Sequence, residues 1–167
     1  MLMNRLTSQE IFDWCSIPWR ELDGRDKKIK LAVRKDRREM MEEIGSLMAD
    51  EVKEHNAQGL PTKWVLPAGP CDEYDGFIRR VNEEGIDCTN LWVFHMDEFL
   101  DWQCRPYPVS DAYESLEGTM AACFYDRIDE ELRPGEDHRI WPRITNLDYP
   151  DEMCDKLGGV DTVWAGV

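Results

Sequence analysis

Two neighbouring carboxylates directly follow an apolar run of the chain. Residues 91–95 read LWVFH, and Asp97 and Glu98 come next within a Met-Asp-Glu-Phe segment. If the run is a strand of a parallel sheet, these acids lie at its carboxyl end, where such sheets bind ligands. Partial desolvation and mutual repulsion there can raise a carboxyl pKa, so that the group accepts a proton near neutral pH. The pair therefore predicts a general base; the alternative is that Asp97 caps a turn and Glu98 is solvated.

A glycine-containing turn follows a second apolar run, residues 63–66. Residues 67–71 read Pro-Ala-Gly-Pro-Cys and lead into a predicted helix. The N–H groups at a helix N-terminus favour anions, and Gly69 lets the main chain approach a ligand closely. Pro70, however, removes one donor, and the next two residues are acidic. The turn is either a phosphate cradle or an ordinary connection capped by its own acids.

Metal and cofactor motifs are missing from the sequence. His95 could pair with Asp97 at a metal, but no third ligand has motif spacing, and a buried histidine bonded to the backbone is the simpler prediction. The six cysteines form no CxxC pair, which is typical of reduced thiols rather than of a disulfide framework or a zinc site. No P-loop, G-x-G-x-x-G or G-x-S-x-G occurs. We therefore expect neither a metal nor a cofactor.

Short apolar runs alternate with helix-length segments along most of the chain. The predicted strands are residues 29–33, 63–66, 91–95, 138–141 and 161–165. The predicted helices begin near residues 36, 72, 110 and 150, and the second to fourth end near residues 85, 132 and 157. This alternation predicts an α/β fold, a Rossmann-like parallel sheet covered by helices.

The helix predicted over residues 110–132 would carry one apolar stripe, interrupted by Gly118. The stripe consists of Tyr113, Leu116, Met120, Phe124 and Ile128.

Residues 1–28 lie outside the alternation and are predicted to form an N-terminal extension of a domain spanning residues 29–167. Thr7 and Glu10 form a capping-box pattern for a short helix, and Asp23-Gly24 predicts a turn. The last predicted strand runs to the end of the sequence, where sheets of this class normally continue with a covering helix. We therefore expect the fold to be incomplete at its C-terminus.

The composition argues against nucleic-acid binding and against a membrane protein. The chain has 167 residues, with 35 acidic and 20 basic side chains and a net charge of −15. Nucleic-acid binding is disfavoured because phosphate neutralisation needs clustered Lys and Arg. No apolar run is long enough for a membrane span, and the first ten residues lack the apolar core of a secretory signal. A cytoplasmic protein that binds neither nucleic acid nor membranes is expected.

Four segments together resemble the glucosamine-6-phosphate deaminase family and its isomerase relatives. They are Trp-Val-Leu-Pro-Ala-Gly at 64–69, the run ending in Met-Asp-Glu-Phe at 91–99, Tyr-Pro-Val-Ser-x-x-Tyr at 107–113 and Gly-Gly-Val-Asp-Thr-Val-Trp-Ala-Gly-Val at 158–167. Their order and spacing match the family from about residue 30 to the end, and Met-Asp-Glu-Phe is the most specific piece.

The resemblance implies a Rossmann-like sheet that binds a sugar phosphate without a cofactor; a homo-oligomer is left open. Asp97 matches the acid that abstracts the C2 proton of the ring-opened amino sugar, and Glu98 matches the adjacent acid. That abstraction starts an aldose–ketose isomerisation that yields fructose 6-phosphate and ammonia. A tuned carboxylate suits this step because the neighbouring carbonyl acidifies the C2–H. The implied substrate- and phosphate-binding residues are Pro67, Ala68, Gly69, Cys71 and Ser110.

The sequence also departs from the family pattern. Residues 70–72, Pro-Cys-Asp, stand where the family has a Ser/Thr-rich turn, His95 stands where an asparagine is usual, and Phe99 replaces a common tyrosine. The family's ring-opening histidine follows the segment that ends here at Val167. We therefore expect this chain to keep the base, to lack the ring-opening group and some phosphate ligands, and to show little deamination.

Two other functions are compatible with the sequence. One is a non-catalytic sugar-phosphate sensor, although residues 1–28 are too short for the helix-turn-helix that such a regulator would carry. The other is a 6-phosphogluconolactonase-like hydrolase, which the Met-Asp-Glu-Phe segment disfavours because it is more similar to the deaminase branch.

Overall fold

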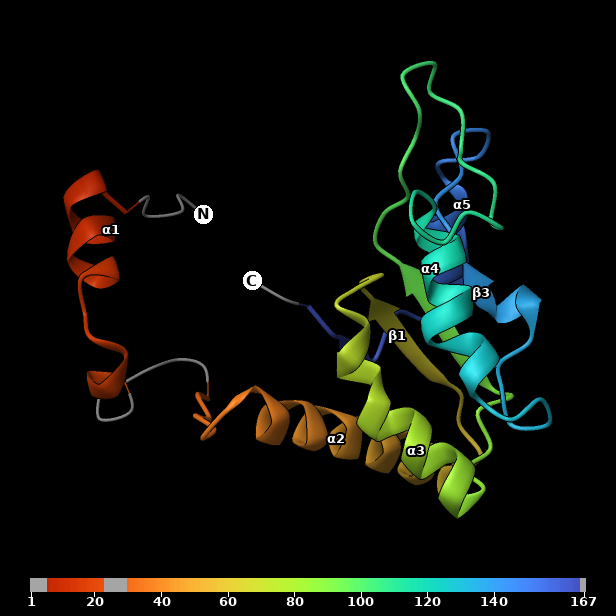
Figure 1. Cartoon of the computed structure of the whole chain (residues 1–167), viewed down its shortest axis with the longest axis horizontal. Coiled ribbons are helices and arrows are strands. Elements are labelled where there is room, and N and C mark those ends of the chain that lie inside the picture. Colours follow the sequence, from red (N-terminus) through yellow and green to blue (C-terminus); the bar gives the residue numbers. More distant parts are fainter. Residues whose placement is uncertain (1–5, 23–29, 166–167) are drawn as a thin grey trace. The chain divides into compact units, whose positions relative to one another are not determined.

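The computed structural model describes residues 6–22 and 30–165 and divides the chain into two compact units, residues 1–35 and 36–167 (Figure 1). The first unit contains helix α1 (Ser8–Cys15) and a 3₁₀ turn, η1 (Trp19–Glu21). The predicted capping box is confirmed, since the Thr7 hydroxyl accepts from the Glu10 N–H and the Glu10 carboxylate accepts from the Thr7 N–H. The turn predicted at Asp23-Gly24 lies outside the described residues.

The strand predicted at residues 29–33 is wrong over its described part. Residues 30–33 adopt no regular secondary structure, and the side chains of Leu31 and Val33 are exposed; Ile29 is outside the described residues. A strand needs a neighbour that pairs with its N–H and C=O groups, and this segment pairs with no strand of the described sheet. An apolar, β-branched composition does not by itself supply that neighbour.

The second unit is built on a sheet of four parallel strands in the order β3-β2-β1-β4. The strands are β1 (Thr62–Leu66), β2 (Leu91–His95), β3 (Arg139–Ile140) and β4 (Thr162–Val163). β1 and β2 pair from Thr62 opposite Leu91 to Leu66 opposite His95, so both end at the same level. The predicted α/β fold with a parallel sheet is confirmed, although β3 and β4 are shorter than the runs that predicted them.

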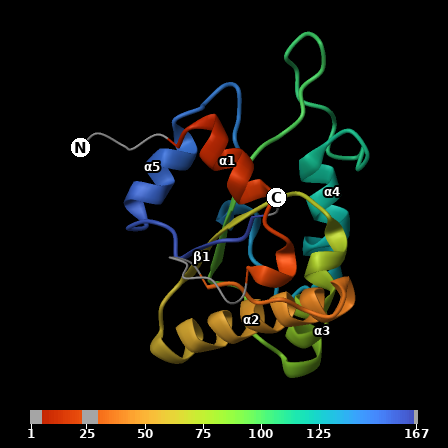
Figure 2. The ribbon, with the colours of Figure 1, turned by 90° about the vertical axis from the view of Figure 1, so that its left-hand side faces the viewer.

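Helices cover both faces of this sheet, as Figure 2 shows for α4 and α5. The helices are α2 (Arg37–Gln58), α3 (Asp75–Glu84), α4 (Leu116–Cys123) and α5 (Tyr149–Lys156). Side chains of α2, α3 and α4 share one buried cluster with Leu91 and Val93 of β2, whereas Phe94 belongs to a second cluster with Met153 of α5. Successive strand residues point to opposite faces, so β2 contributes to both clusters.

Two predicted helices differ from the observed ones at their ends. The helix expected from residue 72 starts as a 3₁₀ turn, η2 (Cys71–Tyr74), and becomes α-helical at Asp75; it ends at Gly85, which has φ 64°. The helix expected over residues 110–132 spans only α4, followed by a 3₁₀ turn, η3 (Tyr125–Arg127). The residues before α4 are instead an irregular segment in which Tyr113 is 88% exposed.

Gly118 explains why the apolar stripe of that helix is interrupted. A Cβ at this position would lie 2.3 Å from the Val109 carbonyl oxygen, so the glycine lets the preceding segment run closely along α4. Among the described residues, no helix is both long enough and apolar enough to cross a bilayer.

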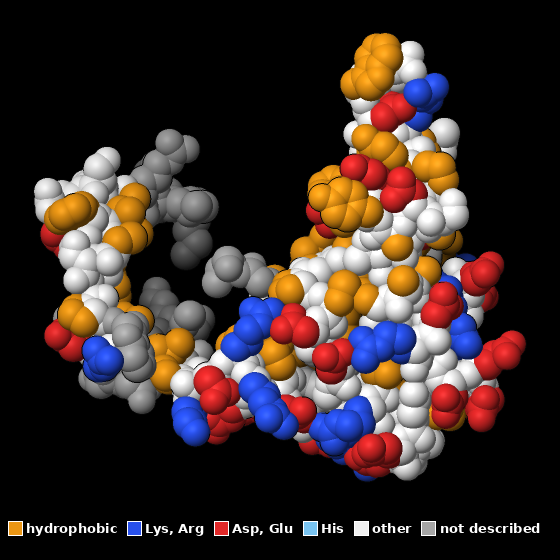
Figure 3. Space-filling model, in the orientation of Figure 1, with side chains coloured by type: hydrophobic (Ala, Val, Ile, Leu, Met, Phe, Trp, Pro, Cys, Tyr) orange, Lys and Arg blue, Asp and Glu red, His pale blue; other side chains and the backbone are white. Residues whose placement is uncertain are grey.

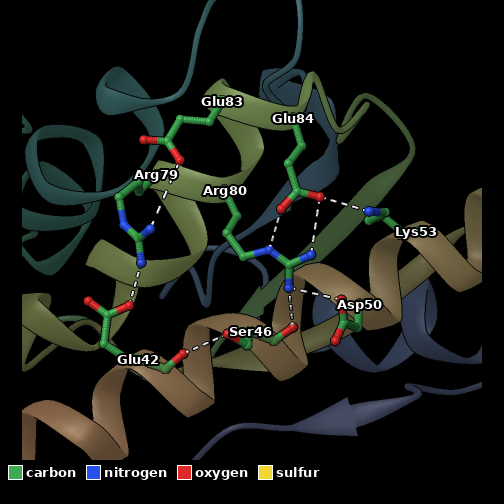
Figure 4. A network of polar contacts seen from close by, with 8 residues as sticks. All are labelled: Glu42, Ser46, Asp50, Lys53, Arg79, Arg80, Glu83 and Glu84. Atoms are coloured by element: carbon green, nitrogen blue, oxygen red, sulfur yellow. Dashed lines mark hydrogen bonds and ion pairs between the residues drawn. The ribbon is translucent and has the colours of Figure 1, made fainter.

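Helices α2 and α3 pack closely and are joined at their outer edge by ion pairs. Mixed acidic and basic side chains cover this part of the surface in Figure 3, and Figure 4 shows the pairs. Arg80 of α3 donates to Glu84 at 2.5 and 3.1 Å and to Asp50 of α2 at 2.9 Å. Lys53 of α2 donates to the same Glu84 at 2.7 Å. Hydrogen bonds from these two cations lower the pKa of Glu84 to about 2.

We predict that Gly45→Ala destabilises the second unit. A Cβ at Gly45 would lie 2.5 Å from the Phe77 backbone nitrogen and 2.7 Å from the Gly76 Cα, so α2 and α3 would have to separate. We expect the free energy of unfolding in urea to fall by about 1–3 kcal/mol. Gly69→Ala is the control, because nothing lies within 4 Å of its added methyl. Equal effects of the two substitutions would show that the helices are not in such close contact.

Candidate functional site

A pocket of about 690 Å³ opens at the carboxyl end of the sheet. It is lined by residues 67–70 after β1, Met96, Asp97 and Phe99 after β2, Leu116 of α4 and Ala165 after β4. The chain passes from β1 to β2 and β3 on one side and then returns to place β4 on the other side of β1. Parallel sheets bind ligands at such a reversal of strand order, outside the carboxyl ends of the strands.

Asp97 stands in the wall of this pocket beside the turn that follows β1. Its side chain is exposed, and it is the one ionisable residue among the described residues that line the pocket. The structure thus brings together Asp97 and the predicted binding residues Pro67, Ala68 and Gly69. A carboxylate in this position can accept a proton from a ligand held against the turn.

Glu98 has a different environment from Asp97. Its carboxylate accepts from the backbone N–H groups of Leu116 at 2.7 Å and Glu117 at 2.9 Å, the first two residues of α4. The next N–H of the helix, that of Gly118, is bonded to the Ser115 hydroxyl at 3.1 Å. The alternative in which Glu98 is solvated is therefore wrong. Its negative charge sits at the positive end of α4 and holds the loop after β2 against that helix.

The turn after β1 lacks part of what a phosphate cradle needs. The turn leads into η2 rather than directly into an α-helix. Asp72 of η2 pairs with Arg37 at 2.6 Å, and that hydrogen bond lowers the pKa of the Asp72 carboxyl. No lysine or arginine is found among the described residues that line the pocket. An anion there would depend on backbone N–H groups alone.

Two predicted binding residues lie outside the pocket lining. Cys71 follows the turn at the start of η2, and burial, followed by the Cys71 thiol, raises the pKa of Cys123 at the end of α4. Ser110 is exposed in the segment between β2 and α4.

That segment, residues 99–114, forms a projecting arm with several exposed apolar side chains, visible at the top of Figures 1 and 3. Its tip is fixed by the Asp101 carboxylate, which accepts from the backbone N–H groups of Gln103 and Arg105 and from the Arg105 guanidinium. Trp102 at this tip is 88% exposed. The arm runs from Phe99, which lines the pocket, to Ser115, the N-cap of α4.

The predicted site residues omit five residues that also line the pocket: Pro70, Met96, Phe99, Leu116 and Ala165. Ala165 could have been found from its position directly after a strand. Leu116 carried no such signal, because it was assigned to the middle of a longer helix.

His95, the last residue of β2, is buried, with 5% of its surface exposed. Its Nε2 is 2.8 Å from the Tyr125 hydroxyl, and its ring stacks on Trp141 with centroids 3.5 Å apart. The histidine is thus bonded to a side chain, which corrects the expected backbone partner. Burial, followed by the charges of Arg139 and Arg143, lowers its pKa to about 3, so the imidazole is neutral.

No metal centre accompanies this histidine. In the part of the chain that the structure describes, no three His, Cys, Asp or Glu residues are grouped so that they could hold a metal ion.

A second pocket, of about 470 Å³, lies beside β3 and α4 and was not anticipated. Arg143 and Glu117 form a two-point ion pair in it, at 2.6 and 2.8 Å, and the Arg139 guanidinium lies 4.0 Å from the centre of the Tyr125 ring. Its charged groups are thus largely engaged with the protein itself.

No protein-family model and no curated protein matches the sequence. Among solved structures, the chain is similar to a monomeric glucosamine-6-phosphate deaminase, described as a missing link of the NagB superfamily, with a TM-score of 0.61 and 19% sequence identity. The match covers 80% of this chain and 53% of that protein, so the chain spans about half the length of its structural neighbour. At this identity the comparison establishes a shared fold, in agreement with the fold that the sequence resemblance implied.

Glu98→Ala is predicted to destabilise the second unit, because two N–H groups at the start of α4 lose their acceptor. We expect the free energy of unfolding in urea to fall by about 1–2 kcal/mol. Glu114→Ala, which removes a neighbouring glutamate that is not part of this cap, should have a smaller effect. A Glu98→Ala protein as stable as the wild type would contradict the capping role.

The buried His95 predicts a loss of stability in acid. The folded protein keeps the imidazole neutral down to about pH 3, whereas the unfolded chain protonates it below the ordinary pKa of 6.5. The contribution is therefore fully present above that ordinary pKa and is lost as the pH falls towards the folded value. Between about pH 7 and about pH 5, this group alone should reduce the free energy of unfolding by roughly 2 kcal/mol.

The measurement is urea unfolding at both pH values. His95→Gln should flatten the pH dependence relative to the wild type, whereas His55→Gln, at a less buried histidine, should leave it largely unchanged. An identical pH dependence in the wild type and His95→Gln would argue against a neutral, buried imidazole.

Proposed function

We propose that this chain is the base-bearing part of an enzyme that acts on an amino-sugar phosphate, of the glucosamine-6-phosphate deaminase/isomerase type. The observation that carries the proposal is the pocket itself. Asp97 and the turn at residues 67–70 line one cavity at the carboxyl ends of parallel strands, where the strand order reverses. The similarity in fold to a glucosamine-6-phosphate deaminase supports the same class of substrate.

In this proposal Asp97 removes the proton from C2 of the ring-opened sugar. The aldehyde at C1 acidifies that hydrogen, so a carboxylate can take it without a metal ion. The electron pair left at C2 is delocalised towards C1, which begins the aldose–ketose isomerisation from which ammonia leaves. Apart from Asp97, the lining is apolar and consists of residues 67–70, Met96, Phe99, Leu116 and Ala165.

The other residues named from the sequence have supporting roles in this proposal. Glu98 positions Asp97 by fixing the loop after β2 to α4. Pro67, Ala68 and Gly69 form the wall against which the sugar lies, and the turn offers backbone N–H groups to its phosphate. Cys71 and Ser110 are outside the lining and do not touch the sugar.

A second candidate, a non-catalytic sugar-binding module, is favoured by one specific observation. Asp97 is the only ionisable group among the described lining residues, so no second acid or base stands opposite it to complete a proton transfer. Such a module would bind the sugar phosphate and leave its C2 hydrogen in place.

Hydrogen exchange separates the two functions. The chain is incubated with glucosamine 6-phosphate in D₂O, and loss of the C2–H signal is followed by proton NMR. We expect exchange with the wild type and a decrease of roughly 10²–10⁴-fold in its rate with Asp97→Asn, because the isosteric amide cannot act as the base. Asp151→Asn, at an exposed acid of α5, is the matched control and should exchange like the wild type.

Exchange that survives Asp97→Asn would reject Asp97 as the base. Saturable binding of the sugar phosphate without any exchange by the wild type would favour the binding module. A loss of exchange in Glu98→Gln at unchanged stability would move the catalytic role to the adjacent acid.

A further inference from the structure

Helix α1 of the N-terminal unit presents an apolar side that is exposed. The helix has no buried residue, and four large apolar side chains on or next to it are at least half exposed: Leu6, Ile11, Phe12 and Trp14. Ile11 and Trp14 are three positions apart and so lie on the same side of the helix, with Phe12 beside them. The acids of α1 are engaged locally, since Glu10 caps its start and Asp13 accepts from a side chain one turn earlier.

The segment that follows α1 is basic, although the chain as a whole is acidic. Residues 20–35 contain seven basic and three acidic side chains, whereas the rest of the chain contains 13 basic and 32 acidic ones. The N-terminal unit thus combines an apolar helix with a positively charged segment. This combination favours a partner surface that is both apolar and acidic.

The arm at residues 99–114 offers a surface of this kind. Its large exposed apolar side chains are Phe99, Leu100, Trp102, Val109 and Tyr113. Hydrophobic side chains are visible at the tip of the arm and along it in Figure 3. Asp111 and Glu114 add negative charge on either side of Tyr113 in the sequence, whereas Asp101 is paired with Arg105. The arm therefore matches the N-terminal unit in both apolar character and charge.

The tip of the arm is held in one conformation by its own contacts. An antiparallel bridge joins Leu100 to Pro106, and the Asp101 N–H donates to the Arg105 carbonyl oxygen at 2.9 Å. The Asp101 carboxylate closes the same turn. Trp102 is thus presented on an ordered turn, so that less conformational entropy is lost when a partner covers it. Tryptophan is also among the residues that contribute most to the free energy of protein association.

We propose that the chain forms a symmetric dimer in which the N-terminal unit of each copy docks on the arm of the other copy. The apolar side of α1 packs against the side chains around Trp102, and the basic segment at residues 20–35 lies near Asp111 and Glu114. A second copy suits this role because every chain carries both surfaces. One twofold axis therefore pairs all four of them.

The two contacts together are large enough for a stable interface. Each contact contains five aromatic side chains that are at least half exposed: Phe12, Trp14, Phe99, Trp102 and Tyr113. An aromatic side chain buries about 150–250 Å² when it is fully covered. Two symmetric contacts therefore reach the roughly 1,200 Å² at which specific interfaces begin. Phe99 also lines the pocket, so the docked partner borders the candidate site.

Sedimentation equilibrium of the whole chain over a wide range of concentrations tests the dimer. We expect a species of twice the mass of one chain, with a dissociation constant that rises with added salt because the opposite charges are screened. Trp102→Ser and Phe12→Ser should each raise the dissociation constant by roughly 100-fold, since each removes an aromatic anchor from both contacts. Leu147→Ser, at an exposed apolar residue outside both surfaces, is the control and should dimerise like the wild type.

A mixture of the two variants identifies which surfaces meet. Trp102→Ser keeps its α1 intact and Phe12→Ser keeps its arm intact, so a pair with one chain of each has one undamaged contact. We therefore expect the mixture to dimerise more tightly than either variant alone. Contacts between two arms or between two α1 helices would not give this result.

The proposal is overturned if the wild type is monomeric at every concentration, if either substitution leaves the dimer unchanged, or if the mixture is no tighter than its components. The wild-type mass is decisive by itself even if a variant fails to fold. The dimer requires no ligand, so its absence would leave the proposed enzymatic function untouched, and a failure of hydrogen exchange would leave the dimer untouched.

Discussion

The candidate site depends on the register between the two central strands. Leu66 and His95 are the last paired residues of β1 and β2, so the turn at 67–70 and the segment at 96–99 leave the sheet at the same level. With β4 on the other side of β1, three loops meet at one edge. A shift of one residue in this pairing would turn the side chains of a strand to the opposite face and would bury a different set of residues. Trp64 and Leu66 of β1 belong to the first buried cluster, whereas Val65 packs against the second. Such a shift would exchange these environments and is therefore costly.

Helix α4 holds the loop that follows β2 in place and so gives the pocket a defined wall. After β2 the chain runs through the arm, residues 99–114, before it reaches α4. A long irregular segment of this kind would by itself leave Asp97 poorly positioned. The Glu98 carboxylate solves this problem locally, because it satisfies the first two N–H groups of α4 at the far end of the arm. Gly118 allows the arm to lie against the same helix. The adjacent acids thus have separate environments, one facing the pocket and one supporting its wall.

Sequence patterns predicted the parts of the fold that depend on local chemistry. The apolar run at residues 91–95 located β2 to the residue, the Asp36 cap located the start of α2, and Gly85 located the end of α3. The failures share a physical cause. Residues 30–33 have a strand composition without a partner strand, and Tyr113 matches the helical period of the predicted stripe although it belongs to the arm. Pairing and packing with distant segments decide such cases, and a local pattern does not contain that information.

The same reasoning applies to the pocket. Asp97 and residues 67–69 were found because their position after strands has a general meaning in parallel sheets. The structural role of Glu98 could not be read from the sequence, because its partners are 18 and 19 positions away. The contact between Tyr74 and Phe124 likewise arises only when η2 packs against the end of α4.

These contacts make α4 the support shared by both walls of the pocket. Its first residues bind Glu98 and so fix the loop that carries Asp97, and Phe124, directly after its last residue, contacts Tyr74 of η2, which follows the turn on the other wall. A change at either end of this short helix therefore acts on the distance between the carboxylate and the turn. Proton abstraction is sensitive to that distance, because a base works only within hydrogen-bond reach of the proton it removes. Helix α4, rather than the arm, is consequently the element that sets the distance between Asp97 and the turn.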